Sequence, residues 1–182
     1  LYTGTGSALT ITTGHQSDFI WIKQRTTVRP HCLFDSVNSS NFAGGNSKYL
    51  VSNTTAALTS NNATQITANS STGFSIGTDN SDQINNNGDT AVAWSWKANG
   101  AGSSNTDGSI TSTPKCFIVK KTSGTSAWSV YHESIGNTKF LNLNGTGAAT
   151  TSSTVWNNTS PTSSVFSVGT ADNGNASGAT YI

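Results

Sequence analysis

Apolar and polar residues alternate along this chain in short runs that end at turn residues. In Asp18–Lys23 both faces of the predicted strand are apolar, which is typical of a strand in the middle of a sheet. In Val92–Lys97 both tryptophans share one face with Val92, which predicts a half-buried strand with an aromatic side. Further strands are predicted at Ala8–Thr13, Cys32–Ser36, Tyr49–Ser52, Gly73–Gly77, Cys116–Lys121, Trp128–His132, Lys139–Leu143, Val165–Gly169 and Thr180–Ile182. No segment has convincing helical periodicity, so the sequence predicts an all-β fold of antiparallel sandwich or jelly-roll type.

The strand pattern occurs twice, in the same order. Phe19–Lys23 resembles Cys116–Lys120, and adding 97 to the residue number also carries Leu33–Ser36 onto Val130–Glu133. Three later blocks match at offsets of 90 to 92. The offset changes only between the blocks, where loops accept insertions. Five matching blocks in order therefore indicate an internal repeat.

The repeat predicts two related β-sandwich units in tandem, one at residues 1–97 and one at 115–182. The stretch between them, 98–114, is rich in Gly, Ser, Asn and Thr, which predicts a linker. By analogy with the first unit, Ile182 falls inside the last strand of the second unit. We therefore expect the second unit to be truncated there.

Composition narrows the classes of function. Charged residues make up 9% of the 182 residues, against about 25% in ordinary soluble domains. The net charge of +1 and the sparse Lys and Arg argue against nucleic acid as a partner. No apolar run has membrane-spanning length, which argues against membrane insertion. Cys32 and Cys116 lie in apolar runs, so we expect two separate buried thiols.

Neither catalysis nor a cofactor is predicted. Glu133 is the only Glu, and its neighbour His132 points to the opposite face of a strand. Asp79, Asp82 and Asp89 lie in an Asn-rich loop whose oxygen atoms suit Ca²⁺. Their spacing does not match an EF-hand, and such clusters commonly form turns, so we predict no metal. If a structural Ca²⁺ binds, these three carboxylates are its candidate ligands.

Carbohydrate binding is the alternative that the aromatic residues raise. Sugar sites use an exposed aromatic ring with Asn or Asp side chains nearby. The candidate residues are Asn87, Asp89, Trp94 and Trp96. Because Trp94 and Trp96 share a face with Val92, we favour the interpretation that they fill the core. Trp128 and Trp156 are further candidates for exposed rings.

Six segments of the chain resemble structural proteins of tailed phages that infect marine bacteria. They are Asp18–Lys23, Leu33–Ser36, Tyr49–Asn53, Gly88–Trp94, Asn105–Ile110 and Trp156–Phe166. The resemblance implies units similar to concanavalin A-like or laminin G-like sandwiches, with no catalytic residues. Those phage proteins usually have a longer β-rich segment between the linker and the second unit, and this chain lacks it.

From the residues and this resemblance we predict a non-enzymatic structural protein of the virion. It would lie on the particle surface or the tail, as a tail fibre, a spike or a capsid-attached appendage. Its expected partners are copies of itself and other virion proteins, which would pair through exposed strand edges and uncharged faces. Two alternatives stay open: a lectin-like module that binds host-surface glycan, and a bacterial surface adhesin or filament subunit.

Overall fold

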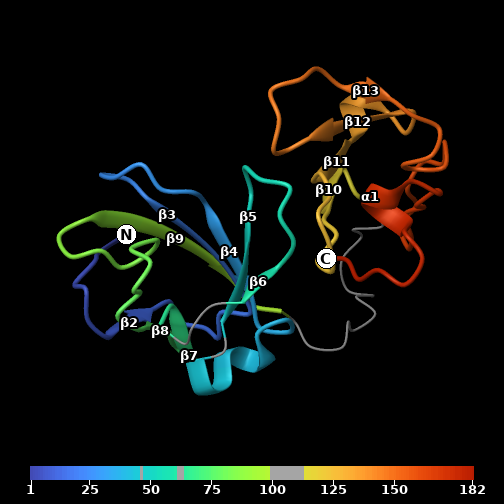
Figure 1. Ribbon diagram of the computed structural model, residues 1–182. Helices are drawn as coiled ribbons and strands as arrows, with labels where there is room; N and C mark the ends of the chain where they lie inside the picture. The colour runs from blue at the N-terminus through green and yellow to red at the C-terminus, as the bar shows by residue number, and fades with distance from the viewer. Residues whose placement is uncertain (46, 61–63, 99–112) are drawn as a thin grey trace. The chain divides into compact units, whose positions relative to one another are not determined.

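The computed structural model describes residues 1–45, 47–60, 64–98 and 113–182 (Figure 1). These residues divide into two compact units. Unit 1 contains the described residues from 1 to 52 and from 58 to 98, and unit 2 contains those from 53 to 57 and from 113 to 182. The predicted linker at 98–114 lies almost wholly outside the described residues.

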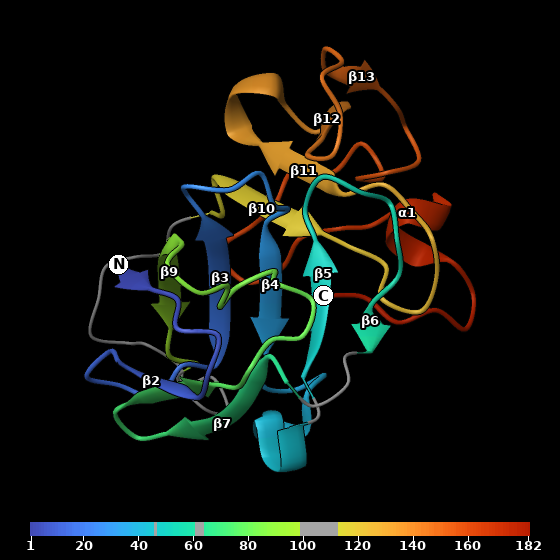
Figure 2. The same cartoon turned by 60° about the vertical axis from the view of Figure 1, so that its left-hand side comes forward.

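Unit 1 is built from two antiparallel sheets (Figure 2). The strands of the larger sheet are β1 (Tyr2–Thr3), β3 (Phe19–Gln24), β4 (Cys32–Asp35), β5 (Lys48–Val51), β6 (Thr59–Ser60) and β9 (Thr90–Trp96). Those of the smaller sheet are β2 (Leu9–Thr12), β7 (Ile66–Ser70) and β8 (Gly73–Ile76). The strands lie in the order β1-β9-β3-β4-β5-β6 in the larger sheet and β2-β8-β7 in the smaller one. The strand with two apolar faces, β3, is therefore central, as predicted.

The core of unit 1 joins the two sheets. Ile20 and Ile22 of β3 belong to it, together with Phe74 and Ile76 of β8. The other buried members are Cys32, Phe34, Phe42, Ile66, Ile84 and Ala91. Each sheet thus covers one apolar face of the other, which is a sandwich-like arrangement. The predicted all-β fold is confirmed.

The described residues of unit 2 form one four-stranded antiparallel sheet. Its strands, in spatial order, are β10 (Cys116–Val119), β11 (Ser129–His132), β12 (Lys139–Asn142) and β13 (Thr150–Thr151). The buried core consists of Val119, Tyr131, Val155 and Trp156. Helical structure in the described residues is short: η1 (Ser40–Gly45) in unit 1, and η2 (Glu133–Ile135) and α1 (Asp172–Asn175) in unit 2.

The two units pair their strands in the same register. The pairs between β3 and β4 include Phe19–Asp35 and Ile22–Cys32, and those between β10 and β11 include Cys116–His132 and Val119–Ser129. Adding 97 to the first pairs gives the second. The β4–β5 and β5–β6 pairings recur likewise as β11–β12 and β12–β13. The bridge between Lys121 and Tyr181 stands in the place of the Gln24–Ala91 pair of β3 and β9. The repeat in the sequence is thus also a repeat of backbone pairing, while the exact unit boundaries stay predictions.

Nine of the predicted strands coincide with strands of the structure, within two residues at each end. The strand predicted at Val165–Gly169 is wrong. The Thr162 hydroxyl there accepts hydrogen bonds from the backbone N–H groups of Ser164 and Val165, which forms a turn in place of a strand. The strand predicted at Thr180–Ile182 is reduced to the single bridge at Tyr181.

The two cysteines are both free thiols. Cys32 is buried as predicted, and burial raises the pKa of its thiol to about 12, which keeps it protonated. The prediction that Cys116 is also buried is wrong, because it lies in β10 at the edge of its sheet and is exposed. None of the helices in the described part of the chain has the length and apolar character that a membrane span needs.

Candidate functional site

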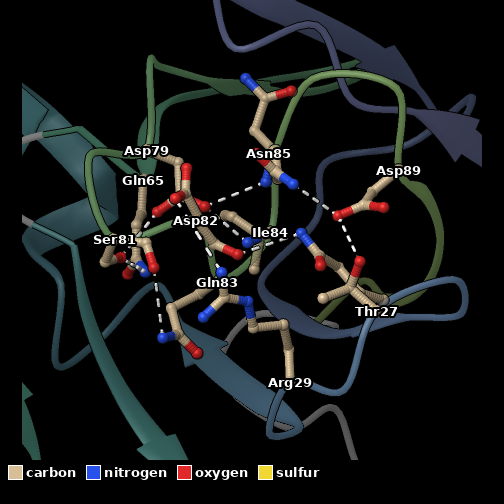
Figure 3. Close-up of polar contacts among 12 residues, drawn as sticks. Thr27, Arg29, Gln65, Asp79, Ser81, Asp82, Gln83, Ile84, Asn85 and Asp89 are labelled. Atoms are coloured by element: carbon tan, nitrogen blue, oxygen red, sulfur yellow. Dashed lines mark hydrogen bonds and ion pairs between the residues drawn. The ribbon is translucent and has the colours of Figure 1, made fainter.

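The first candidate region is the loop between β8 and β9, which carries the predicted Ca²⁺ ligands (Figure 3). Asp79 is completely buried there. One carboxylate oxygen accepts the backbone N–H groups of Ile84 (2.5 Å) and Asn85 (3.0 Å), and the other accepts the Ser81 hydroxyl (2.8 Å). Its negative charge is therefore satisfied by protein donors that hold the loop in shape.

The other two carboxylates have separate partners. Asp82 lies 3.9 Å from the Arg29 guanidinium in an exposed ion pair. Asp89 accepts hydrogen bonds from Asn86, Thr27 and Thr26, and these bonds lower the pKa of its carboxyl group. No group of three or more His, Cys, Asp or Glu side chains that could hold a metal ion occurs in the residues that the structure describes. The structure does not bring Asp79, Asp82 and Asp89 into one site.

The second candidate region is an aromatic face on the outer side of the larger sheet of unit 1. It consists of Phe19, Trp21, Trp94 and Trp96. Phe19 is paired with Trp96, and Trp21 with Trp94, across the neighbouring strands β3 and β9. The ring centroids are 5.4 Å apart in the first pair and 5.9 Å apart in the second. Trp94 is 45% exposed and Trp96 is 49% exposed.

The interpretation that Trp94 and Trp96 fill the core is therefore wrong. Ala91 and Ala93 take the inward positions of β9 and contact the core of unit 1. Because successive side chains of a strand point to opposite faces, the tryptophans project outward. Trp21, Trp94 and Trp96 line a shallow hollow on this surface.

His31 holds the ring of Trp21 in place. The indole Nε1–H of Trp21 donates a hydrogen bond to Nδ1 of His31 over 2.8 Å, and the two rings meet edge to face. Partial burial, and then the nearby positive charge of Lys23, lower the pKa of His31. A neutral imidazole is the form that can accept this hydrogen bond.

The other predicted sugar-binding residues lie away from this face. Asp89 is bound to Thr26 and Thr27, five residues before Trp94 along the chain. Five residues of extended chain span about 17 Å. Asp89 and the exposed Asn87 therefore lie before the first residue of β9, at the end of the strand away from Trp94 and Trp96. Trp128 and Trp156 are both buried, which excludes them as exposed rings. The predicted four-residue site is thus reduced to its two tryptophans.

Sequence reasoning also missed an apolar groove in unit 2. Ile118, Phe166, Val168, Tyr181 and Ile182 line it. Phe166 lies 4.4 Å from the ring centroid of Phe117 and remains 47% exposed. The sequence contains one signal for this groove, the repeat, in which Ile118 corresponds to Trp21. In the structure, Trp21 also lies on an outer face.

The His–Glu pair considered for catalysis is engaged in local contacts. Nδ1 of His132 is within 2.7 Å of the Ser134 hydroxyl, and Glu133 forms an exposed ion pair with Lys115. These contacts cap the short helix η2 and connect it to the residue before β10.

Comparison with known proteins gives one family. A family model described as a domain of unknown function (DUF7483) matches the chain twice, over residues 1–113 and 111–182. None of the curated proteins and none of the solved structures compared with the chain gives a significant match. The family description names no activity, so the predicted likeness to phage structural proteins stays a prediction.

We expect Asp79→Asn to destabilise the protein more than Asp82→Asn. The amide keeps the volume of the carboxyl group but has only one acceptor oxygen, so a buried donor loses its partner at a cost of about 1–3 kcal/mol. Asp82→Asn removes one exposed ion pair, which contributes about 0–1 kcal/mol. Urea denaturation followed by circular dichroism measures both changes. A stabilisation by Ca²⁺ that Asp79→Asn abolishes would instead favour a metal site.

The pKa of His31 predicts a loss of stability in acid. The folded protein keeps this imidazole neutral to a lower pH than the unfolded chain, in which the pKa is about 6.5. Below that pH the unfolded chain binds a proton that the folded protein does not, so the free energy of unfolding falls as the pH falls. Above about pH 6.5 the contribution of His31 to the free energy of unfolding is constant.

The measurement is urea denaturation between about pH 5 and pH 7, followed by tryptophan fluorescence. His31→Asn removes the titrating group, so its stability should depend less on pH than that of the wild type. Val37→Asn is the control and should keep the wild-type dependence, because Val37 is exposed and its side chain does not titrate. If His31→Asn also keeps it, another group is responsible.

Proposed function

We propose that this chain, which belongs to the family described as a domain of unknown function (DUF7483), is a non-enzymatic structural module of a tailed-phage virion. It would form part of a tail fibre, a spike or a capsid-attached appendage and act by assembling with copies of itself and with other virion proteins. The observation that carries the assembly is the backbone pairing pattern that occurs twice in one chain with few charged residues.

Strand β10 supports this proposal because it is an edge strand with apolar side chains. It pairs with β11 on one side. On the other side, Lys121, which follows β10, pairs with Tyr181. Its Ile118 is 41% exposed and lines the apolar groove with Phe166 and Ile182. An apolar surface of a neighbouring copy that covered this groove would remove these side chains from water.

Unit 1 shows what lies at the equivalent position beside its own sheet. Its strand β3 corresponds to β10 and is paired on both sides, with β4 and with β9. There, Trp94 of β9 packs against Trp21, the counterpart of Ile118. In unit 2, residues 180–182 begin at the equivalent position, since Tyr181 pairs with Lys121 and the backbones of Ile182 and Lys120 exchange hydrogen bonds.

The composition supports assembly as well. Only 9% of the residues are charged, and the net charge is +1, so the repulsion between copies is small. A pairing pattern that occurs twice in one chain also suits a particle built from repeated modules.

We expect Ile118→Lys to prevent self-association. A lysine in the groove would have to lose its hydration when a neighbouring copy covers the groove. Sedimentation velocity over a series of protein concentrations should show oligomers of the wild type and monomers of the variant. Val37→Lys is the control, since Val37 is 88% exposed and outside the groove. A wild type that is monomeric throughout would contradict the assembly.

The virion assignment has its own test. Antibodies raised against this chain should label the tail or surface of intact phage particles in immunogold electron microscopy. Particles that carry the gene and remain unlabelled would contradict the assignment, whatever the sedimentation experiment shows.

A further inference from the structure

We propose that the aromatic face of unit 1 is a carbohydrate-binding site, in which pyranose rings stack on Trp94 and Trp96. This site is separate from the groove of unit 2, and the proposal does not depend on the assembly proposed above. It rests on the position of the rings and on the polar groups at the border of the face. It also rests on the indole N–H groups of Trp94 and Trp96, which have no hydrogen-bond partner among the described residues.

The rings are held rigidly in an exposed position. They belong to two paired strands in the middle of a six-stranded sheet, and elements of this kind position side chains more precisely than loops do. Trp21 is fixed by His31, and Trp94 packs against Trp21 edge to face at an angle of 66°. Trp96 packs against Phe19. A ligand would therefore meet a preformed surface and would not have to order these side chains.

The two exposed tryptophan rings follow one another along β9. Trp94 and Trp96 are two residues apart on β9, which places their attachment points about 6.8 Å apart. That spacing is comparable with the length of one sugar ring in a chain. Each tryptophan also has an aromatic neighbour on β3, so the surface extends across both strands. It fits two consecutive pyranose rings, each with its apolar C–H face against an indole.

The polar groups of this face favour a sugar over an apolar partner. Neither Trp94 nor Trp96 has a hydrogen-bond partner for its indole Nε1–H among the residues that the structure describes. A lipid chain or a dry protein interface would bury these donors unpaired, at a cost of about 1–3 kcal/mol each. Sugar hydroxyl groups can accept both hydrogen bonds while the ring covers the apolar part of the indole.

The border of the face has further donors. His31 uses Nδ1 to accept from Trp21, so its other ring nitrogen, Nε2, carries the proton and can donate. Lys23 lies on the same face of β3, two residues from Trp21, and is partly exposed. Ring stacking in the centre with donors at the border matches the chemistry of a neutral glycan, which has an apolar ring face and hydroxyl acceptors at its rim.

The test uses the whole chain and short oligosaccharides of glucose, galactose, mannose and N-acetylglucosamine. Saturation-transfer NMR should show contact to the C–H protons of one ring face for at least one of these sugars. In a fluorescence titration with that sugar, we expect Trp94→Ala and Trp96→Ala each to weaken binding about tenfold. Trp94→Phe, which keeps a ring and loses the N–H donor, should have a smaller effect.

Phe166→Ala is the matched control, because Phe166 is an aromatic residue of similar exposure (47%) in the other unit. It should bind sugar as the wild type does. Circular dichroism verifies that each variant is folded. The proposal is overturned if none of the sugars gives saturation transfer, or if both alanine variants bind as tightly as the wild type. It is also overturned if Trp94→Ala abolishes self-association, because the aromatic face would then be an interface between copies.

Discussion

The alternation of side chains along β3 is the constraint on which the rest of unit 1 depends. Ile20 and Ile22 reach the core in one register only, and a slip by one residue would exchange them for Phe19 and Trp21. Because β9 and β4 pair with β3 on either side, the same choice decides which of their side chains face outward. Burying the two isoleucines thus places Trp94 on the outer surface, opposite Trp21.

Asp79 and Asn85 hold the loop between β8 and β9 in shape. The Asp79 carboxylate accepts hydrogen bonds from the backbone N–H groups of Ile84 and Asn85. The side chain of Asn85 then makes further hydrogen bonds. The Asn85 amide donates to the carbonyl oxygens of Ser7 and Gly77 and accepts from the backbone of Thr5, so it connects the loop to the segment before β2. A chain with few charges relies on buried amides and carboxylates of this kind to satisfy its loops.

Apolar alternation in the sequence is sufficient to predict the longer strands, because burial on one face requires it. It cannot predict β6 or β13, each of which consists of two Thr or Ser residues and is held by backbone pairing. Nor can it decide which face of β9 is covered, since both faces carry apolar residues and the answer depends on the partner sheet. Trp94 and Trp96 could therefore be identified as candidates, but their exposure and the contact between Trp21 and His31 required the structure.

Comparison of the two units distinguishes the strand positions that form the core from those that form the surface. The inward positions of the repeated strand are apolar in both, Ile20 and Ile22 in β3 and Phe117 and Val119 in β10. The outward position differs, since Trp21 corresponds to Ile118. Outward side chains contribute less to the core, so they can change while the pairing is kept. One backbone pattern can then support two surfaces, and we propose that one binds sugar and the other contacts a neighbouring copy. Substitutions at these surfaces should therefore affect binding well before they affect folding.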